Sequence, residues 1–291
     1  MNINLKGVGV ALVTPFHKDG SIDFKSFKKL IDHVSAGKVD YLVPLGTTGE
    51  SVTMNKDERT AVLDFVKEEN TKNLPIVVGF GGNNTRDLLN CLNEIDFDGV
   101  DAILSVSPMY NKPSQRGIYQ HYKAIADVCS VPIILYNVPS RTGCNISAET
   151  TLSLAADFRN IIGIKEASGN FDQFMQILKD KPKNFLMISG DDTVTLPLIA
   201  LGADGVISVV ANAYPKEFSS MVHHAMEGNF SDARKLHYKL LDITNSLFME
   251  NNPAGIKAAL SLLGITQEFV RLPLVPVSKA TQNKMMAVMK L

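Results

Sequence analysis

Eight short runs of apolar and β-branched residues alternate with longer segments of mixed polarity along most of this chain. The runs are continuously hydrophobic, which is typical of strands buried on both faces of a parallel sheet. They are Val8–Val13, Tyr41–Leu45, Ile76–Phe80, Ala102–Val106, Ile133–Tyr136, Ile161–Lys165, Phe185–Ser189 and Val206–Val209. The alternation therefore restricts the chain to α/β architectures with a parallel sheet.

The segments between the runs carry apolar residues at helical spacing, with polar residues on the opposite face. These helical patterns are Phe24–Val34, Lys56–Glu69, Ser114–Cys129, Ser147–Ala156, Phe171–Lys179, Val194–Leu201 and Lys216–Glu227. Eight βα units in a chain of 291 residues predict a (β/α)8 TIM barrel. A doubly wound open sheet is the main alternative, and the number and even spacing of the units favour the closed barrel.

Beyond Gly228 the pattern is entirely helical. It covers Ser231–Met249, Pro253–Leu263 and Ser278–Lys290, and Asn252-Pro253 resembles an N-cap followed by proline at the first helical position. We therefore predict a barrel over residues 1–228 and a C-terminal helical subdomain over residues 229–291.

Charge and composition exclude several classes of protein. The formal net charge is −1 and there is no Lys/Arg block, so nucleic acid is not expected as the main partner. No apolar run approaches the ~20 residues of a membrane-spanning helix, and the N-terminus does not resemble a signal peptide. The three cysteines, Cys91, Cys129 and Cys144, have no metal-like spacing, and we expect a reducing cytoplasmic location.

Lys165, at the end of the sixth run, is the sharpest candidate for chemistry, because active sites of this fold lie at the carboxyl ends of the strands. If Lys165 points inward, strand parity points Gly163 inward too, where the glycine leaves room for a ligand, and points Glu166 away. A lysine without a carboxylate partner, its pKa lowered from ~10.4 to ~7–8, can attack a carbonyl. A surface Lys–Glu pair is the alternative, and the spacing alone does not decide between them.

Other strand ends offer groups that suit a Schiff-base site. Tyr136 can shuttle a proton, although an aromatic cap on the barrel is the alternative. Thr47 and Thr48 lie between glycines in a turn that suits a carboxylate, or they belong to an ordinary turn. Arg141 can bind a second carboxylate, or it is a solvated loop arginine.

The remaining motifs do not indicate a cofactor. Asp191 and Asp192 most simply cap the helix that follows them. The sequence contains no P-loop, no HExxH metal motif and no GxSxG elbow. We therefore expect neither a metal nor an organic cofactor.

Five motifs in order resemble the dihydrodipicolinate synthase family, also called 4-hydroxy-tetrahydrodipicolinate synthases. They are GTTGES at 46–51, SPMYNKP at 107–113, YNVPSRTG at 136–143, GIKEASG at 163–169 and GDD at 190–192. The resemblance covers essentially the whole chain. It implies a lyase of the class I aldolase type that condenses pyruvate with L-aspartate 4-semialdehyde in the diaminopimelate branch of lysine biosynthesis.

The resemblance also implies catalytic roles. Lys165 matches the lysine that forms a Schiff base with pyruvate, and Tyr136 matches the tyrosine of the proton relay. Thr47 matches the threonine that links this tyrosine to Tyr110, which enters the site of a neighbouring subunit. Relatives are mostly homotetramers built from two tight dimers, so the resemblance implies self-association of the same kind.

Substrate contacts follow from the same resemblance. Thr48 matches the contact to the pyruvate carboxylate, and Gly190 and Ile207 match residues that line that pocket. Arg141 matches the arginine that holds the carboxylate of aspartate semialdehyde. Relatives acting on sugar acids, of the N-acetylneuraminate or 2-keto-3-deoxygluconate type, usually lack this arginine, and they remain the alternative function.

The allosteric site of lysine-inhibited relatives is altered here. The matching positions are Ser51, Val52, Lys56, Arg59, Asn83, Asp87 and Met109. Lys56 and Arg59 would repel the ammonium of lysine, and Met109 replaces an aromatic wall. We therefore predict weak or absent inhibition by lysine.

Overall fold

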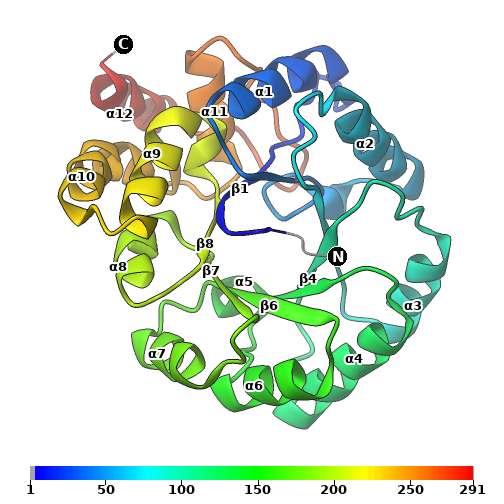
Figure 1. Ribbon diagram of the computed structural model, residues 1–291. Coiled ribbons are helices and arrows are strands. Elements are labelled where there is room, and N and C mark those ends of the chain that lie inside the picture. Colours follow the sequence, from blue (N-terminus) through cyan, green and yellow to red (C-terminus); the bar gives the residue numbers. More distant parts are fainter. Residues whose placement is uncertain (1–3, 291) are drawn as a thin grey trace.

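The strands of the computed structural model, which describes residues 4–290, form a barrel (Figure 1). Within this range eight strands pair in parallel in the order β2-β1-β8-β7-β6-β5-β4-β3. They are β1 (Gly7–Ala11), β2 (Tyr41–Val43), β3 (Val77–Gly81), β4 (Ala102–Val106), β5 (Ile133–Asn137), β6 (Ile161–Glu166), β7 (Leu186–Ser189) and β8 (Gly205–Ser208).

The barrel closes between β2 and β3. A parallel bridge joins Leu42 to Ile76, and the Leu42 N–H donates to the Pro75 carbonyl at 2.9 Å. The Gly79 N–H donates to the Pro44 carbonyl at 2.8 Å. The predicted (β/α)8 barrel is therefore confirmed, and the open-sheet alternative is wrong.

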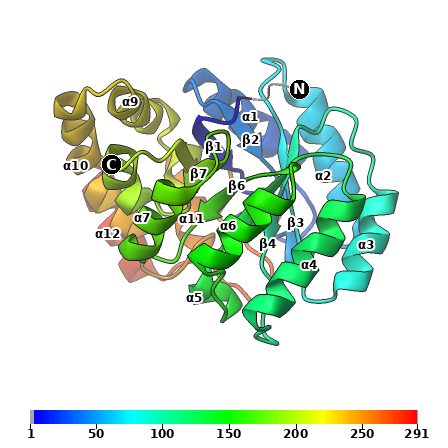
Figure 2. The same cartoon turned by 60° about the horizontal axis from the view of Figure 1, so that its bottom comes forward.

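Helices surround the strands, and α3, α4, α6 and α7 pack side by side on one flank (Figure 2). The helices of the barrel are α1 (Phe24–Ala36), α2 (Lys56–Glu69), α3 (Thr85–Glu94), α4 (Gln115–Val128), α5 (Pro139–Thr142), α6 (Ala148–Asp157), α7 (Phe171–Asp180), α8 (Thr195–Ala200) and α9 (Pro215–Met226), with 3-10 turns η1 (Ser51–Thr53), η2 (Asp192–Val194) and η3 (Val210–Asn212). The helices α3 and α5 were not predicted from the sequence.

The apolar runs are buried because the strands are covered on both faces. The inward side chains fill the barrel itself, and Val43, Ile134, Ile188 and Ile207 belong to this inner cluster. The outward side chains pack under the helices, where α1 buries one apolar stripe that includes Phe27. This packing fixes the strand ends, and with them the cavity described below.

Three helices follow the barrel: α10 (Phe230–Leu247), α11 (Ala254–Leu262) and α12 (Lys279–Met289). Helix α10 packs against α9, and α12 packs against α10, on one side of the ring in Figure 1. The predicted C-terminal helices are therefore present. None of the helices in residues 4–290 combines the length and apolarity needed to cross a membrane.

The start of α11 differs from the expected N-cap. Helix α11 begins at Ala254 with Pro253 as its cap residue, one position later than the sequence indicated. Asn252 uses its side-chain amide to contact Thr48 in the barrel instead of capping the helix. A contact so distant in sequence leaves no local pattern around Asn252.

Candidate active site

A cavity of about 880 Å³ opens at the carboxyl ends of the strands. The last residues of several strands line it, among them Ala11, Val43, Tyr136 and Lys165. The segment Asn251–Pro253 and the later Pro273 and Leu274 complete the wall. The cavity therefore lies where the barrel fold was expected to carry its active site.

Lys165 and Tyr136 lie side by side in the floor of this cavity. They are register partners on the neighbouring strands β6 and β5, which places both side chains on the same side of the sheet. The Lys165 Nζ lies 4.5 Å from the centroid of the Tyr136 ring, and Lys165 is 5% exposed. The lysine amine is thus largely withdrawn from solvent and faces the cavity beside a phenol.

Glu166 points away from the cavity, as strand parity predicted. Its carboxylate is fully buried and accepts hydrogen bonds from the side-chain amides of Asn137, at 2.9 Å, and Gln173, at 2.6 Å. The Ser168 N–H donates to it at 2.7 Å, and burial raises the pKa of this carboxyl. Lys165 and Glu166 do not form a surface ion pair, so that alternative is excluded.

The glycines near the site serve packing, which corrects the reason given for Gly163. A Cβ at Gly163 would lie 2.8 Å from the Leu186 Cβ on the next strand, so the glycine permits strand contact and does not make room for a ligand. Gly190 does line the cavity, and a Cβ there would lie 2.6 Å from that of Ala167. At Gly190 the backbone itself forms part of the cavity wall.

Thr48 and Arg141 are linked through Asn252. The Asn252 Nδ2 donates to the Thr48 Oγ1 at 2.9 Å, and the Arg141 Nη2 donates to the Asn252 carbonyl at 3.1 Å. All three residues line the cavity. Within the described residues, the buried Asn252 Oδ1 has no hydrogen-bond partner. Sequence reasoning missed Asn252, although it joins the two predicted carboxylate contacts.

The turn that carries Thr47 and Thr48 has an unusual backbone. It runs between Leu45 and Glu50, whose φ angles are 60° and 55°, in the left-handed region. The buried Thr14 Oγ1 donates to the Gly49 carbonyl at 2.8 Å. This conformation leaves Thr47 exposed at the cavity and Thr48 buried in its wall.

Two predicted site residues do not face the cavity in this chain. Tyr110 is 87% exposed, and its backbone has a φ of 71°. Ile207 is 1% exposed and belongs to the apolar cluster inside the barrel. Neither is among the lining residues within 4–290, whereas Lys165, Tyr136, Thr47, Thr48, Arg141 and Gly190 all are.

Asp192 does not have the capping role expected for it. Asp191 accepts from the Thr193 N–H at 2.9 Å and caps the turn η2. Asp192 turns inward and accepts from the backbone N–H groups of Val209, at 3.0 Å, and Val210, at 3.3 Å. It therefore ties the end of β7 to the turn after β8.

The cavity combines groups for one kind of chemistry. A neutral lysine amine can add to a carbonyl carbon, and the adjacent phenol can move protons to and from the adduct. Threonine hydroxyls and a guanidinium suit carboxylates on the reacting molecules. The arrangement therefore fits a carbonyl compound that also bears a carboxylate.

Comparison with known proteins agrees with this chemistry. A family model described as the dihydrodipicolinate synthetase family matches residues 4–291. A 4-hydroxy-tetrahydrodipicolinate synthase of Parabacteroides distasonis is 50% identical over 289 residues, which cover 99% of this chain and 97% of that protein.

Two solved structures have the same fold throughout. One is a monomeric dihydrodipicolinate synthase variant, with a TM-score of 0.95 and 40% identity over 98% of this chain and 96% of that one. The other is a chloride-inhibited dihydrodipicolinate synthase of Acinetobacter baumannii in complex with pyruvate. Its TM-score is 0.95 and its identity 39%, over 98% of each chain.

Proposed function

Because this chain belongs to the dihydrodipicolinate synthetase family, we propose that it condenses pyruvate with L-aspartate 4-semialdehyde through a Schiff base on Lys165. The activity is that of a 4-hydroxy-tetrahydrodipicolinate synthase, a lyase of the class I aldolase type in lysine and diaminopimelate biosynthesis. One observation carries the assignment of Lys165. Its amine lies in the cavity beside Tyr136, while Glu166 is engaged by amides elsewhere.

The reaction begins at the lysine amine. The neutral Lys165 Nζ adds to the keto carbon of pyruvate, and loss of water gives an imine. Removal of a proton from the methyl group gives an enamine, whose carbon attacks the aldehyde. The amino group of the second substrate then adds to the imine carbon and displaces Lys165. Tyr136 supplies and removes protons in these steps, with Thr47 linking it to Tyr110.

The two substrate carboxylates have separate partners. The hydroxyl and turn of Thr48 receive the carboxylate of pyruvate, and Gly190 lines that pocket. Arg141, at the entrance, receives the carboxylate of aspartate semialdehyde as a charge-assisted pair. The Asn252 bridge holds both contacts at a fixed separation. Aldolases for sugar acids are not favoured, because the similar proteins carry the other activity.

Tyr110 bears on the assembly of the enzyme. Its side chain is exposed and does not face the cavity of its own chain, which suits a role in the site of a second subunit. The protein would then act as a homotetramer made of two dimers. We propose a cytoplasmic location for it.

The decisive experiment traps the imine. Treatment with pyruvate and borohydride should fix a reduced adduct on Lys165, which peptide mass spectrometry would locate, because the reagent converts the imine into a stable amine. Lys165→Arg, which keeps the charge but cannot form the imine, should give no adduct and lose activity by about 10³-fold or more. An adduct on another lysine would contradict the proposal.

Parallel assays with N-acetylneuraminate and 2-keto-3-deoxygluconate test the alternative substrates, and we expect no cleavage of either.

A further inference from the structure

A second lysine, Lys257, is not among the residues that line the cavity but is buried against the carboxylate of Glu50, which is one of them. The Lys257 side chain is 0% exposed and that of Glu50 is 1% exposed, and the Lys257 ammonium donates to the Glu50 carboxylate. Lys257 also donates to the Phe269 carbonyl at 2.9 Å and lies 4.1 Å from the centroid of the Phe16 ring. Burial lowers the pKa of Lys257 to about 8, against the opposing effect of Glu50.

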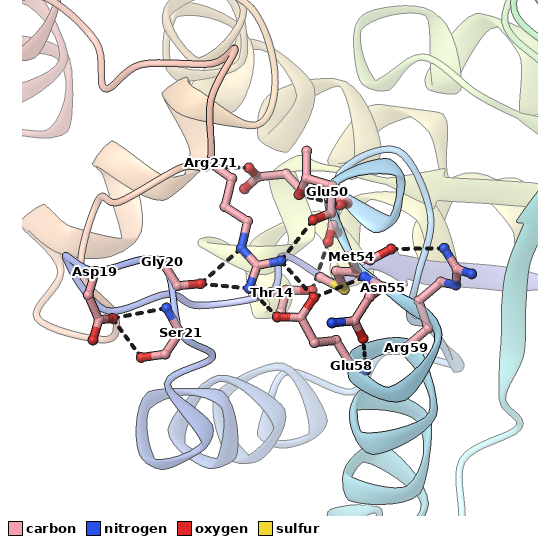
Figure 3. A network of polar contacts seen from close by, with 12 residues as sticks. Thr14, Asp19, Gly20, Ser21, Glu50, Met54, Asn55, Glu58, Arg59 and Arg271 are labelled. Atoms are coloured by element: carbon pink, nitrogen blue, oxygen red, sulfur yellow. Dashed lines mark hydrogen bonds and ion pairs between the residues drawn. The ribbon is translucent and has the colours of Figure 1, made fainter.

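Arg271 extends this pair into a network that joins the C-terminal region to the segments that follow β1 and β2 (Figure 3). Its backbone N–H donates to the second oxygen of the Glu50 carboxylate at 2.9 Å. Its guanidinium donates to Glu58, at 3.0 Å, and to the carbonyls of Gly20 and Thr53, at 2.9 Å each. Glu50 therefore has both oxygens engaged by the C-terminal region.

Glu50 ends the turn that presents Thr47 and Thr48. A backbone in the left-handed region is costly for a residue with a side chain, so contacts of that side chain must hold it there. The contacts come from Lys257 of α11 and from the backbone N–H of Arg271. Pro273 and Leu274, a few residues after Arg271, line the same cavity. The network thus fixes two walls of the cavity relative to each other.

We propose that Glu50 and Lys257 are positioning residues, which hold the Thr48 turn in the geometry that receives the carboxylate of the substrate keto acid. This inference rests on the proposed function, because it assigns a task to residues that do not touch the reacting atoms. A buried ion pair contributes little to stability compared with a well-packed apolar pair, because removing both charges from water is costly. The ion pair instead holds the Thr48 turn in one conformation.

The test separates stability from positioning. Lys257→Met keeps the buried stem but leaves the Glu50 charge unpaired, so the melting temperature should fall. Glu50→Gln with Lys257→Met removes both charges, and most of the lost melting temperature should return. The KM for pyruvate should stay raised by roughly tenfold or more in both variants, because a displaced Thr48 turn binds the carboxylate poorly. We expect a smaller change in kcat than in KM.

The matched control is Lys181→Met, which removes a partly buried lysine paired with Asp204 at the opposite end of the barrel. It should leave the KM unchanged. If Lys257→Met does not fold, Glu50→Gln alone and the double variant still report on the turn. A normal KM in the double variant would overturn the proposal.

Trapping with pyruvate and borohydride keeps the two hypotheses apart. If the unaltered enzyme gives no adduct on Lys165, the proposed function fails. If the unaltered enzyme gives the adduct and the double variant needs no higher pyruvate concentration to form it, only the positioning role fails.

Discussion

Among single side chains, Asp192 is unusual because its carboxylate is buried where two strands end. It is 4% exposed and is held by two backbone N–H groups, and burial raises its pKa from a usual value of 3.8 to about 6. Between these pH values the folded chain holds a proton that the unfolded chain has lost. The contribution of the protonated Asp192 carboxyl to the free energy of unfolding is therefore complete below about pH 3.8 and is lost as the pH rises through 6.

Asp192→Asn should reverse this loss. The asparagine amide keeps an acceptor for the backbone N–H groups of the strand ends but carries no charge. The free energy of unfolding of the variant, relative to that of the unaltered protein, should therefore increase by up to ~3 kcal/mol between pH 4 and pH 7.5. Thermal unfolding of both proteins at several pH values measures the difference. Asp191→Asn, at an exposed neighbour, should show no such trend. A difference that does not change with pH would contradict the prediction.

Lysine should inhibit the enzyme weakly or not at all. Lys56 is paired with Glu94 at 2.8 Å, and the Arg59 Nη1 donates to the Met54 carbonyl at 2.9 Å. Two cations at the positions that match the inhibitor pocket of relatives disfavour a third positive charge. Initial rates should be unchanged at sub-millimolar lysine, and half-inhibition in that range would refute the prediction.

Sequence reasoning found the site residues that carry recognisable chemistry and missed those that act through distant contacts. Lys165 ends an apolar strand, where a lysine is conspicuous, and the parity of that strand correctly separated it from Glu166. Asn252 and Lys257 reach Thr48 and Glu50 across more than 200 positions of sequence. No local pattern marks such a pair, because the barrel alone brings the two ends of the chain together.

At the level of elements, the strands were predicted better than the helices. A parallel strand covered on both faces must be apolar throughout, which leaves a continuous run in the sequence. Helix α3 escaped prediction because its buried stripe contains only Leu88 and Leu92 among polar residues. Helix α5 spans only four residues, too few for a periodic pattern.

Replacing Gly255 should destabilise the protein, although this glycine lies in a helix. An alanine there gains ~1 kcal/mol of helix propensity, but its Cβ would lie 1.9 Å from the Leu247 carbonyl of α10. We expect Gly255→Ala to destabilise the protein by about 2 kcal/mol or more, measured by denaturant unfolding.

Gly117→Ala, in α4, is the matched control. The nearest atom to its Cβ would be the Pro113 Cβ at 3.3 Å, so little change in stability is expected. Equal effects at the two glycines would show that the contact between α10 and α11 does not require a glycine.

At the level of the whole molecule, the role proposed for Tyr110 in the site of a neighbouring subunit can be tested with mixed dimers of two inactive variants. Tyr110→Phe and Lys165→Ala should each be nearly inactive alone. In a mixed dimer, the chain that retains Lys165 receives its tyrosine from the partner. Co-expressed chains should therefore recover about a quarter of normal activity, because half of the dimers are mixed and each has one complete site. Activity no greater than that of the separate variants would contradict a shared site.

The division of the chain at residue 228 stays a prediction. The helices α10 and α11 pack on the barrel, α12 packs on both of them, and α11 supplies Lys257 to Glu50, which lines the cavity. A chain ending after Gly228 would leave the Glu50 carboxylate unpaired beneath the Thr48 turn.

The ion pair between Glu50 and Lys257 also sets an order of events during synthesis. The ribosome releases the Thr48 turn early, so Glu50 emerges before the residues that contact its carboxylate. Its partners Lys257 and Arg271 emerge only after all eight strands have been made. The two walls of the cavity that these contacts join can therefore be fixed to each other only when nearly the whole chain has been made.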